Sequence, residues 1–335
     1  MRKFLATLVL VAAIVCAWMY GTNSRSHSVS FYSMDTPMTL TAYGEKAENA
    51  LSAARKRIKQ IENEISVTDD ESDIAKLNSG TALVPQEDTA QLINTALELS
   101  AQTAGAFDPT IYPILRAWGF TTGAYKVPEK SELDELKKLT GIEKVHLDGS
   151  KFTLESGTMI DLGGIGKGYA AQKATETLKE QGVKSAILNL GGNVQTLGTP
   201  PHRKFWRVGI RAPKDESLLG VLSIGECAIV TSGGYERYFI APNGEVCWHI
   251  IDPDTAHPAR SGVTSSTVVG HDGTLCDALS TAFFVMGAQK SANFWKAHSE
   301  FGFILLEGET IWVTEDLEKN FVPDKAFSSI NVVRR

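Results

Sequence analysis

Five strand-like segments follow one another through the middle of the chain with no helix between them. Each is rich in apolar residues and bounded by Gly, Pro, Asn or Asp. They span residues 185–191, 206–213, 220–232, 247–253 and 265–272. A chain without regular strand–helix alternation does not build a doubly wound parallel sheet. We therefore predict an α+β fold whose sheet is mostly antiparallel.

The segments on either side of this block have the periodicity of amphipathic helices. Residues 48–66 repeat apolar side chains at helical spacing opposite a charged face. Further helices are expected near residues 88–104, 131–140, 169–182, 275–286 and 288–298, and two closing strands near 301–308 and 310–316. No internal repeat and no linker-like stretch interrupts this pattern after residue 31. We therefore predict one folded domain over residues 31–330.

The first twenty residues have the layout of an export signal. Arg2 and Lys3 precede an uncharged, largely apolar run that continues to Tyr20. This run just reaches the lower limit for a membrane-spanning helix. The positive charges stay inside, so the bulk of the chain is predicted to be exported, to the periplasmic side of the cytoplasmic membrane.

Three fates are open for residues 1–20. Val15 precedes Cys16, whereas a lipoprotein signal needs a small residue there, and no good Ala-x-Ala cleavage site follows. We favour an uncleaved membrane anchor, with a cleaved signal and a lipid anchor as alternatives. Residues 21–30 are small, polar and Ser-rich, which predicts a linker between membrane and domain.

Charge and cysteine content exclude several classes of function. The net charge of −6 and the absence of a Lys/Arg run argue against a nucleic-acid partner. Cys227, Cys247 and Cys276 form no Cys-x-x-Cys motif, so neither a zinc site nor a disulfide framework is predicted. One pair could form in an oxidising compartment, but we expect three small buried side chains.

The stretch IDLGGIGKGYAA, residues 160–171, contains four glycines within six residues. It fits neither the dinucleotide fingerprint, because its third Gly is misplaced, nor a P-loop, because Gly168 follows Lys167 where Ser or Thr is required. Glycines still allow a close backbone approach, and a following helix offers N–H groups to an anion. Asp161 would repel a bare phosphate unless it binds a hydroxyl or a metal lies between. A tight turn without ligand is the alternative.

The segment TLCDALSTAFFVMG places two oxygen-bearing side chains on one helix face. Asp277 and Thr281 are four residues apart, and the rest of this helix is nearly all apolar. A buried carboxylate needs a partner, and Mg²⁺ prefers oxygen ligands. The alternative is a capping box formed by Thr274 and Asp277.

Several other segments permit either a functional or a purely structural interpretation. Phe107 and Trp118, within residues 106–120, could stack on a flat ring or simply belong to the core. His249, on a predicted strand next to Asp252, could act as an acid or base or fill a structural role. NLGGN and TSGGYERY are Gly-rich strand ends that could equally be hairpin turns.

Taken in order, eight segments resemble the ApbE family of FAD:protein FMN transferases. The resemblance covers roughly residues 31–320. The segments are SMDTPMTL, SDIAKLN, AFDPT…P…WGF, DLGGIGKGYAA, NLGGN, TSGGYERY, HIIDP and DALSTAFFVMG.

The resemblance implies an α+β fold of the tunnelling-fold type and an exported, often membrane-tethered enzyme that uses Mg²⁺. Such enzymes split FAD at the pyrophosphate, release AMP and attach FMN through a phosphoester to a Thr or Ser of a target protein. Typical targets are subunits of sodium-pumping NADH:quinone reductases and related membrane redox complexes. The alternatives are an FAD pyrophosphatase that makes FMN and AMP, and a non-catalytic exported flavin-binding protein. A dehydrogenase is disfavoured, because the dinucleotide fingerprint is absent.

The resemblance also implies roles for individual residues. Asp277, Thr281 and the Gly164 carbonyl would bind the metal, with Ser280 joining or merely neighbouring the site, and His249 would be the acid/base. The residues that would contact FAD are Asp161, Lys167, Met34, Thr68, Ala106, Phe107, Asp108 and Ile251. This chain departs from the family at three places: Asp35 replaces a usual Gly, Cys276 replaces a frequent Ala, and Thr68 stands where an aromatic residue is common.

Overall fold

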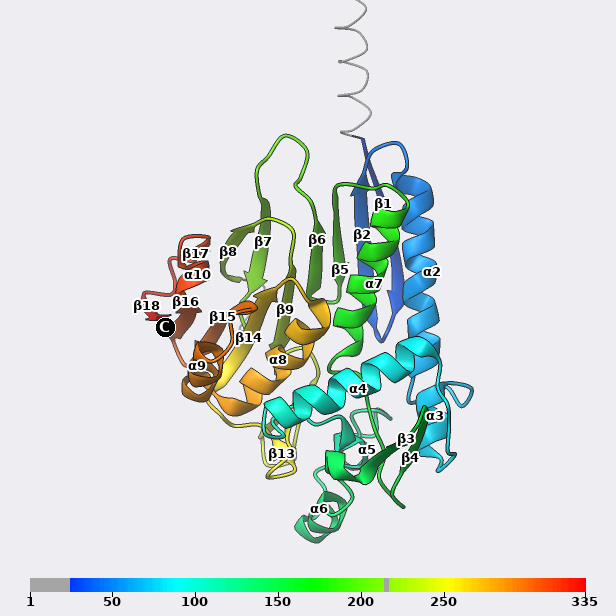
Figure 1. The fold of residues 1–335 in the computed structure, drawn as a ribbon. Helices are drawn as coiled ribbons and strands as arrows, with labels where there is room; N and C mark the ends of the chain where they lie inside the picture. The colour runs from blue at the N-terminus through cyan, green and yellow to red at the C-terminus, as the bar shows by residue number, and fades with distance from the viewer. Residues whose placement is uncertain (1–24, 214–216) are drawn as a thin grey trace, which may run out of the picture.

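A nine-stranded sheet forms the centre of the fold (Figure 1). The computed structural model describes residues 25–213 and 217–335. Within them, the strands pair in the order β1 (Ser26–Ser33), β2 (Thr36–Tyr43), β5 (Ala186–Leu190), β6 (Asn193–Leu197), β9 (Ala228–Gly233), β14 (Val263–Gly270), β15 (Phe301–Glu307), β16 (Thr310–Thr314) and β18 (Ser329–Val333). Neighbouring strands are antiparallel except β16 and β18, which are parallel. The predicted α+β fold with a mostly antiparallel sheet is confirmed.

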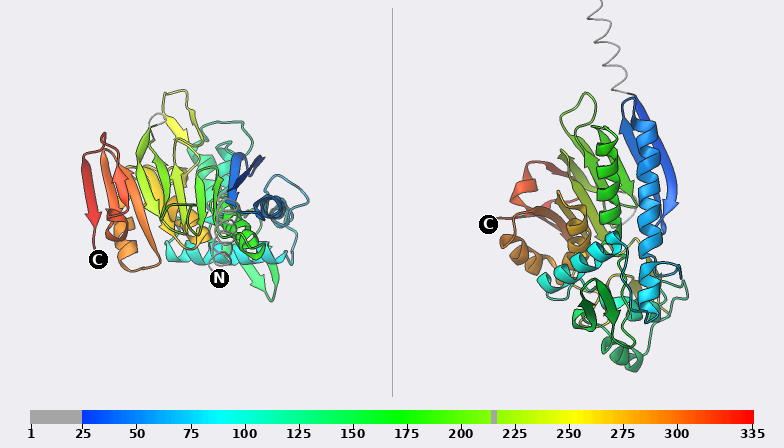
Figure 2. Two further views of the ribbon diagram at one scale, coloured as in Figure 1. Left: turned by 90° about the horizontal axis from the view of Figure 1, so that it is seen from above. Right: turned by 45° about the vertical axis from the view of Figure 1, so that its right-hand side comes forward.

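Helices cover one face of this sheet (Figures 1 and 2). They are α2 (Ala47–Ile65), α7 (Gly166–Glu180), α8 (Gly273–Met286) and α9 (Ala288–Lys296). The apolar face of α2 points inward, and both Ile58 and Ile61 are fully buried. The helix α8 is apolar on nearly all sides because it packs against the sheet, α7 and α9 at once. All four helices were predicted, with ends that differ by a few residues.

A smaller sheet packs on part of the opposite face. It contains β7 (Trp206–Arg211), β8 (Leu218–Ile224) and β17 (Phe321–Pro323), and it shares a second apolar core with the central sheet. The segment 220–232 was predicted as a single stretch of strand. The chain instead changes sheet between Ile224 and Ala228, so that β8 belongs to the small sheet and β9 to the central one.

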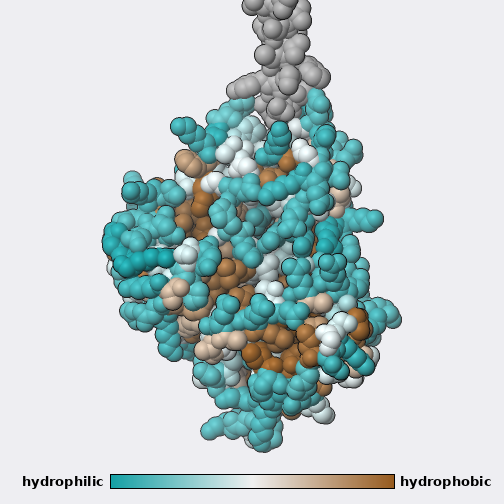
Figure 3. Space-filling model, in the orientation of Figure 1, coloured by the Kyte–Doolittle hydropathy of each residue, from teal (hydrophilic) through white to brown (hydrophobic). Residues whose placement is uncertain are grey.

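The remaining segments lie mainly at one end of the sheet (Figure 2). They are α3 (Asp73–Asn78), α4 (Glu87–Gln102), η1 (Pro109–Ile111), α5 (Tyr112–Ala117), α6 (Lys130–Lys137), η2 (Ile142–Lys144), β3 (Val145–Asp148), β4 (Lys151–Leu154), β10 (Tyr238–Ile240), β11 (Val246–Trp248), β12 (Ile251–Asp252) and β13 (His257–Pro258). The short helix α10 (Glu315–Glu318) follows β16 in the chain. The predicted helices near 88–104 and 131–140 correspond to α4 and α6. Figure 3 shows a largely hydrophilic face on which apolar residues gather in the lower half, near α4 and α5.

Trp118 belongs to a third apolar core in this end region. Its side chain is 1 % exposed, and its Nε1 donates a 2.9 Å hydrogen bond to the carbonyl oxygen of Ala256. Trp118 is therefore a core residue, and the hypothesis that it stacks on a ligand ring is wrong. The three cysteines Cys227, Cys247 and Cys276 are free and buried, as predicted.

The N-terminal part of the described chain differs from its prediction. Residues 26–30, expected within a linker, belong to β1, which pairs along its whole length with β2. The predicted anchor or signal at residues 1–20 lies outside the described residues. Within residues 25–213 and 217–335, no helix combines the length and apolarity needed to cross a membrane.

Candidate active site

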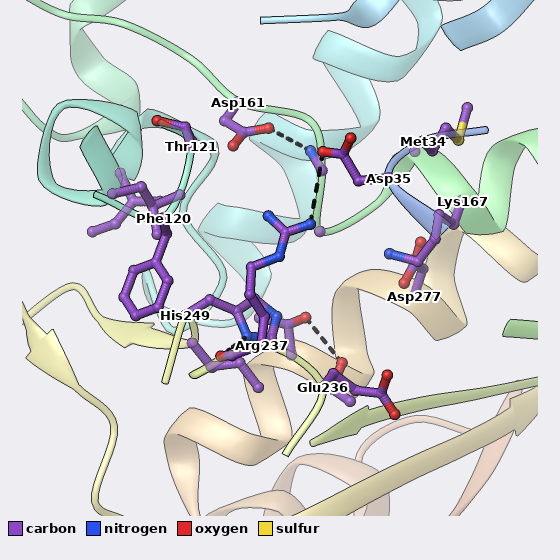
Figure 4. Close-up of a pocket in the computed structure, with 18 of the residues that line it drawn as sticks. Met34, Asp35, Phe120, Thr121, Asp161, Lys167, Glu236, Arg237, His249 and Asp277 are labelled. Carbon is purple, nitrogen blue, oxygen red and sulfur yellow. Dashed lines mark hydrogen bonds and ion pairs between the residues drawn. The ribbon is translucent and has the colours of Figure 1, made fainter. Parts of the chain in front are cut away.

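A pocket of about 440 Å³ lies where the end region meets the helical face of the sheet. This volume falls within the ~300–1,000 Å³ typical of small-molecule sites. The twelve residues to which the resemblance assigns a metal, FAD or acid/base role line this one pocket: Met34, Thr68, Ala106, Phe107, Asp108, Asp161, Gly164, Lys167, His249, Ile251, Asp277 and Thr281. Figure 4 shows Lys167 and Asp277 on one side of it, and His249 with Phe120 on another.

The Gly-rich stretch forms the turn that leads into α7. Asp161 accepts a 2.7 Å hydrogen bond from the amide of Gly163, which shapes the turn before the helix begins at Gly166. A Cβ on Gly164 would lie 3.1 Å from the ring of Phe107 and 3.8 Å from Oγ1 of Thr281. Because Gly164 has no side chain, its backbone can lie close to Phe107 and Thr281. The first amides of α7 are engaged within the protein, Gly166 with the carbonyl of Leu162 and Gly168 with Asp277, so the helix favours an anion in the pocket through its dipole.

Two glycines allow α7 and α8 to touch. A Cβ on Gly168 would overlap the carbonyl oxygen of Gly273 in the first turn of α8. At this contact, the amide of Gly168 donates a 2.7 Å hydrogen bond to Oδ2 of Asp277. Burial raises the pKa of Asp277, while the nearby charge of Lys167 and the backbone amides act in the opposite direction.

Asp277 does not cap α8. The N-cap is Asp272, whose carboxylate accepts from the amides of Thr274 and Leu275 at 2.8 and 3.0 Å. The capping-box alternative for Thr274 and Asp277 is therefore wrong. The carboxylate of Asp277 is instead buried at the pocket, at 3 % residue exposure.

The oxygen ligands around Asp277 suit a magnesium ion. Thr281 lies one turn further along α8, and its Oγ1 is 3.3 Å from Oγ of Ser232. Within residues 25–213 and 217–335, no cluster of three His, Cys, Asp or Glu residues could hold a metal. A cation here would find the carboxylate of Asp277 and the hydroxyl of Thr281, and would complete its shell with water and substrate oxygens. Mg²⁺ binds in this way, with few protein ligands.

Ser280 lies next to this oxygen set without lining the pocket. It is fully buried, donates a 2.8 Å hydrogen bond to the carbonyl of Asp277, and lies 2.7 Å from Oγ of Ser232. Ser232 in turn reaches Thr281. Ser280 therefore positions the hydroxyl of Thr281 through Ser232.

His249 is held in its neutral form. It lies one residue beyond β11, at a bend, and not on the strand where the sequence placed it. Its Nδ1 is 3.1 Å from the carbonyl oxygen of Arg237. Since a carbonyl only accepts, Nδ1 carries the proton and Nε2 carries the lone pair. Burial, followed by the charges of Arg237 and Lys167, lowers the pKa of His249 to about 4.

The turn between β1 and β2 forms another wall. Met34 and Asp35 both have positive φ, 47° and 57°, which is costly for residues other than glycine. Glu62 of α2 stabilises this turn by accepting from the amide of Met34 at 2.5 Å and from Oγ of Ser33 at 2.7 Å. Asp35 also lies 3.8 Å from the guanidinium of Arg237 (Figure 4). The left-handed backbone is therefore kept although Asp replaces Gly.

Phe107 and Asp108 come from the loop before η1. Phe107 is 4 % exposed, so one side of its ring belongs to the main core. Asp108 accepts from the amide and hydroxyl of Thr110 at 2.8 and 2.6 Å and thereby caps η1. Burial raises the pKa of Asp108, against the effect of these hydrogen bonds. Asp161 also has a raised pKa, caused mainly by burial.

Sequence reasoning missed several residues that line the pocket. Glu62, Phe120, Asn193 and Arg237 are among them. Asn193 ends NLGGN and Arg237 lies within TSGGYERY, two segments that had been named as Gly-rich strand ends and as part of the family resemblance, with no role given to either residue. The available signal was a polar side chain directly after the glycines of NLGGN and an arginine three residues after those of TSGGYERY. Glu62 gave none, because it lies on the charged face of an amphipathic helix.

The fold and the pocket define an α+β protein with an enzyme-like site for a phosphate-bearing ligand. A lysine at the start of a helix suits an anion, buried carboxylates suit a bridging cation, and an adjacent histidine carries an unprotonated Nε2. The comparisons agree with this class. The ApbE family matches residues 34–305. The chain belongs to the ApbE family.

Relatives and solved structures agree with this assignment. A Klebsiella pneumoniae FAD:protein FMN transferase is 32 % identical over 80 % of this chain and 85 % of its own length. The corresponding enzyme of Treponema pallidum is 31 % identical over 80 % of each chain. The crystal structure of the ApbE protein of Thermotoga maritima matches with a TM-score of 0.80 and 30 % identity, covering 90 % of this chain and 98 % of that one. The flavin transferase ApbE of Vibrio cholerae, at 24 % identity, shares the fold with a TM-score of 0.77.

Proposed function

We propose that this protein transfers FMN from FAD to a Thr or Ser hydroxyl of a target protein, releasing AMP in a Mg²⁺-dependent reaction. The main support for this proposal is that one pocket is lined by the neutral histidine His249 and by Asp277, Thr281, Gly164 and Lys167. Family membership and the transferase relatives support the flavin chemistry. The metal is inferred from the oxygen atoms around Asp277, and the acceptor hydroxyl and the leaving group from the resemblance to the family.

The reaction is a displacement at phosphorus. The acceptor oxygen forms a bond to the phosphorus of the FMN half, and the bond from that phosphorus to the bridging oxygen breaks. AMP leaves with the bridging oxygen and its electron pair. The proton of the acceptor hydroxyl passes to Nε2 of His249, which the hydrogen bond between Nδ1 and Arg237 leaves unprotonated.

Charge placement accounts for the mixed character of the pocket. Lys167 and the N-terminus of α7 attract the diphosphate. Asp161 and Asp277 would repel it if they faced it alone. When bound, Mg²⁺ neutralises charge on the phosphate oxygens and so tolerates nearby carboxylates. Positioning and charge neutralisation supply most of the acceleration in phosphoryl transfer, and the base contributes about 10²- to 10⁴-fold.

The location and the partner complete the proposal. We place the domain on the periplasmic side of the cytoplasmic membrane, held there by the apolar segment at residues 1–20. The acceptor would then be an exported segment of a membrane redox complex, such as a subunit of a sodium-pumping NADH:quinone reductase.

Mass spectrometry of a candidate acceptor tests this function. The acceptor is incubated with the protein, FAD and Mg²⁺, and we expect one FMN added to a Thr or Ser together with one AMP released. A parallel reaction omits the acceptor. If free FMN forms equally in both reactions, the protein hydrolyses FAD and does not transfer FMN. If no AMP is released under any condition, the protein binds flavin without catalysis.

A further inference from the structure

Asn193 carries an unpaired, buried amide in the wall of the pocket. It is the first residue of β6, it is 1 % exposed, and it lines the same pocket as Lys167 and Asp277. Within the described part of the chain, neither Nδ2 nor Oδ1 of Asn193 has a hydrogen-bond partner. The proposed function assigns no role to this residue.

An amide in this position is costly unless something pairs with it. An asparagine side chain offers two N–H donors and an oxygen that accepts. Burying these groups without partners destabilises a fold, and native proteins rarely tolerate it outside functional sites. Because the amide of Asn193 borders the pocket, a ligand held there can supply both kinds of partner.

The next residue on the same side of β6 locates Asn193 relative to the helices. Gln195 is also buried, at 4 % exposure, and its Oε1 has no partner among the described residues. A Cβ on Gly273 would lie 3.1 Å from this Oε1, so Gln195 abuts the contact between α7 and α8. Gln195 does not line the pocket. Asn193 is two residues, about 7 Å, further along the strand.

The residues around Asn193 indicate that it contacts the middle of FAD, where the ribityl hydroxyls and the phosphates lie. Asn193 pairs across the sheet with Val230, and the pocket wall continues from Val230 into Ser232, which contacts Thr281. The Gly168–Asp277 hydrogen bond lies at the helix contact that Gln195 touches. Asn193 is therefore on the side of the pocket where the diphosphate would lie.

We propose that Asn193 binds the ribityl-diphosphate part of FAD, its amide N–H donating to a phosphate oxygen and its carbonyl accepting from a ribityl hydroxyl. Phosphate oxygens only accept, whereas ribityl hydroxyls both donate and accept, so this segment satisfies both halves of the amide. The assignment rests on the proposed function for the identity of the ligand.

FAD binding by Asn193→Leu tests the assignment. Leucine keeps the size of the side chain and removes its polar atoms. FAD titration is followed by flavin fluorescence without acceptor protein and without Mg²⁺, so that no FAD is consumed. We expect the dissociation constant to rise about tenfold or more, as for a lost hydrogen bond to a charged group. The unliganded variant should unfold at the same temperature as the wild type or higher, because an unpaired polar group is gone.

Gln195→Leu is the matched control. It removes a buried, partly unpaired amide from the same face of the same strand, but outside the pocket. Its FAD affinity should stay within about twofold of the wild type. An unchanged affinity in Asn193→Leu, or an equal loss in both variants, would overturn the assignment.

Asn193→Asp provides a second test in case the leucine variant does not fold. It keeps the shape, replaces both N–H donors by a carboxylate, and should weaken FAD binding at least as much as Asn193→Leu. FAD binding that matches the wild type contradicts the proposal. Because binding is measured apart from transfer, a wild-type protein that binds FAD through Asn193 but flavinylates no acceptor would refute the proposed function alone.

Discussion

The amide of Gly168 in α7 donates a 2.7 Å hydrogen bond to Oδ2 of Asp277 in α8. The two residues are 109 positions apart in the sequence. This contact orients the carboxylate that would bind the metal and joins α7 and α8, which supply Lys167, Asp277 and Thr281 to the pocket. Several expected outcomes depend on it.

Asp277→Asn should abolish Mg²⁺-dependent activity while the protein stays folded. Asparagine keeps an oxygen that can accept from Gly168, but it removes the charge that attracts the cation. AMP release from FAD is measured against Mg²⁺ concentration. The control is Asp272→Asn, which changes the N-cap of the same helix outside the pocket and should stay active. Full activity in Asp277→Asn would refute the metal site.

Gly168→Ala should lower the free energy of unfolding by about 1–3 kcal/mol, because the new methyl group overlaps the carbonyl of Gly273 and forces α7 and α8 apart. Urea denaturation measures the change. Gly225→Ala is the control, since a Cβ there meets nothing within 4 Å, and it should change stability by less than about 0.5 kcal/mol. Equal stability of the two variants would show that the helices do not need this close approach.

His249→Ala should bind FAD normally and lose transfer by about 10²- to 10⁴-fold, the usual contribution of a general base. FAD affinity and the rate of FMN attachment are measured separately. His146→Ala serves as control, because His146 is exposed on β3, away from the pocket. Undiminished transfer in His249→Ala would remove the base from the mechanism.

The pH dependence should reflect the lowered pKa of His249. Folding moves this pKa from 6.5 to about 4, because the site is buried and faces Arg237 and Lys167. Between these values the unfolded chain binds a proton that the folded protein excludes, so His249 reduces stability progressively as pH falls from about 6.5 to 4. His249→Gln should therefore lose less stability than the wild type between pH 7 and pH 5, as measured by thermal unfolding.

The lowered pKa of His249 also predicts how the rate of FMN transfer changes at acidic pH. Nε2 of His249 stays available as a base well below pH 6.5. We expect no loss of transfer with an apparent pKa near 6.5 in a pH–rate profile restricted to conditions where the protein is folded. A rate that falls with the ordinary histidine pKa would show that His249 is not shielded as described.

Asp35→Gly should be at least as stable as the wild type. Glycine adopts the positive φ of this turn without strain, and the exposed pair with Arg237 contributes at most about 1 kcal/mol. Asp35→Val, in contrast, should lose about 1–2 kcal/mol, because a β-branched residue is poorly accommodated in the left-handed region. Chemical denaturation distinguishes the two, and a more stable Val variant would contradict the turn geometry.

Much of the secondary structure was predictable because periodicity is a local property. The helix α2 followed from the spacing of its apolar residues, and the antiparallel character of the sheet followed from the lack of strand–helix alternation. The hairpin of β1 and β2 was missed because its polar, Ser- and Thr-rich strand lies at a sheet edge, where burial leaves little pattern. The change of sheet between β8 and β9 was missed because both strands are equally apolar.

Local pattern left each candidate segment open, and the order of eight segments, through their resemblance to the family, named twelve residues that all line one pocket. It could place Asp277 and Thr281 on one face of a helix, but it could not distinguish a helix cap from a ligand, nor core from site for Trp118. Those distinctions came from packing between distant segments. Asp272 took the cap, Gly168 and Gly273 let two helices touch, and Asn193 was left unpaired beside the pocket, because each outcome depends on which surfaces meet in space and not on the residues next in the chain.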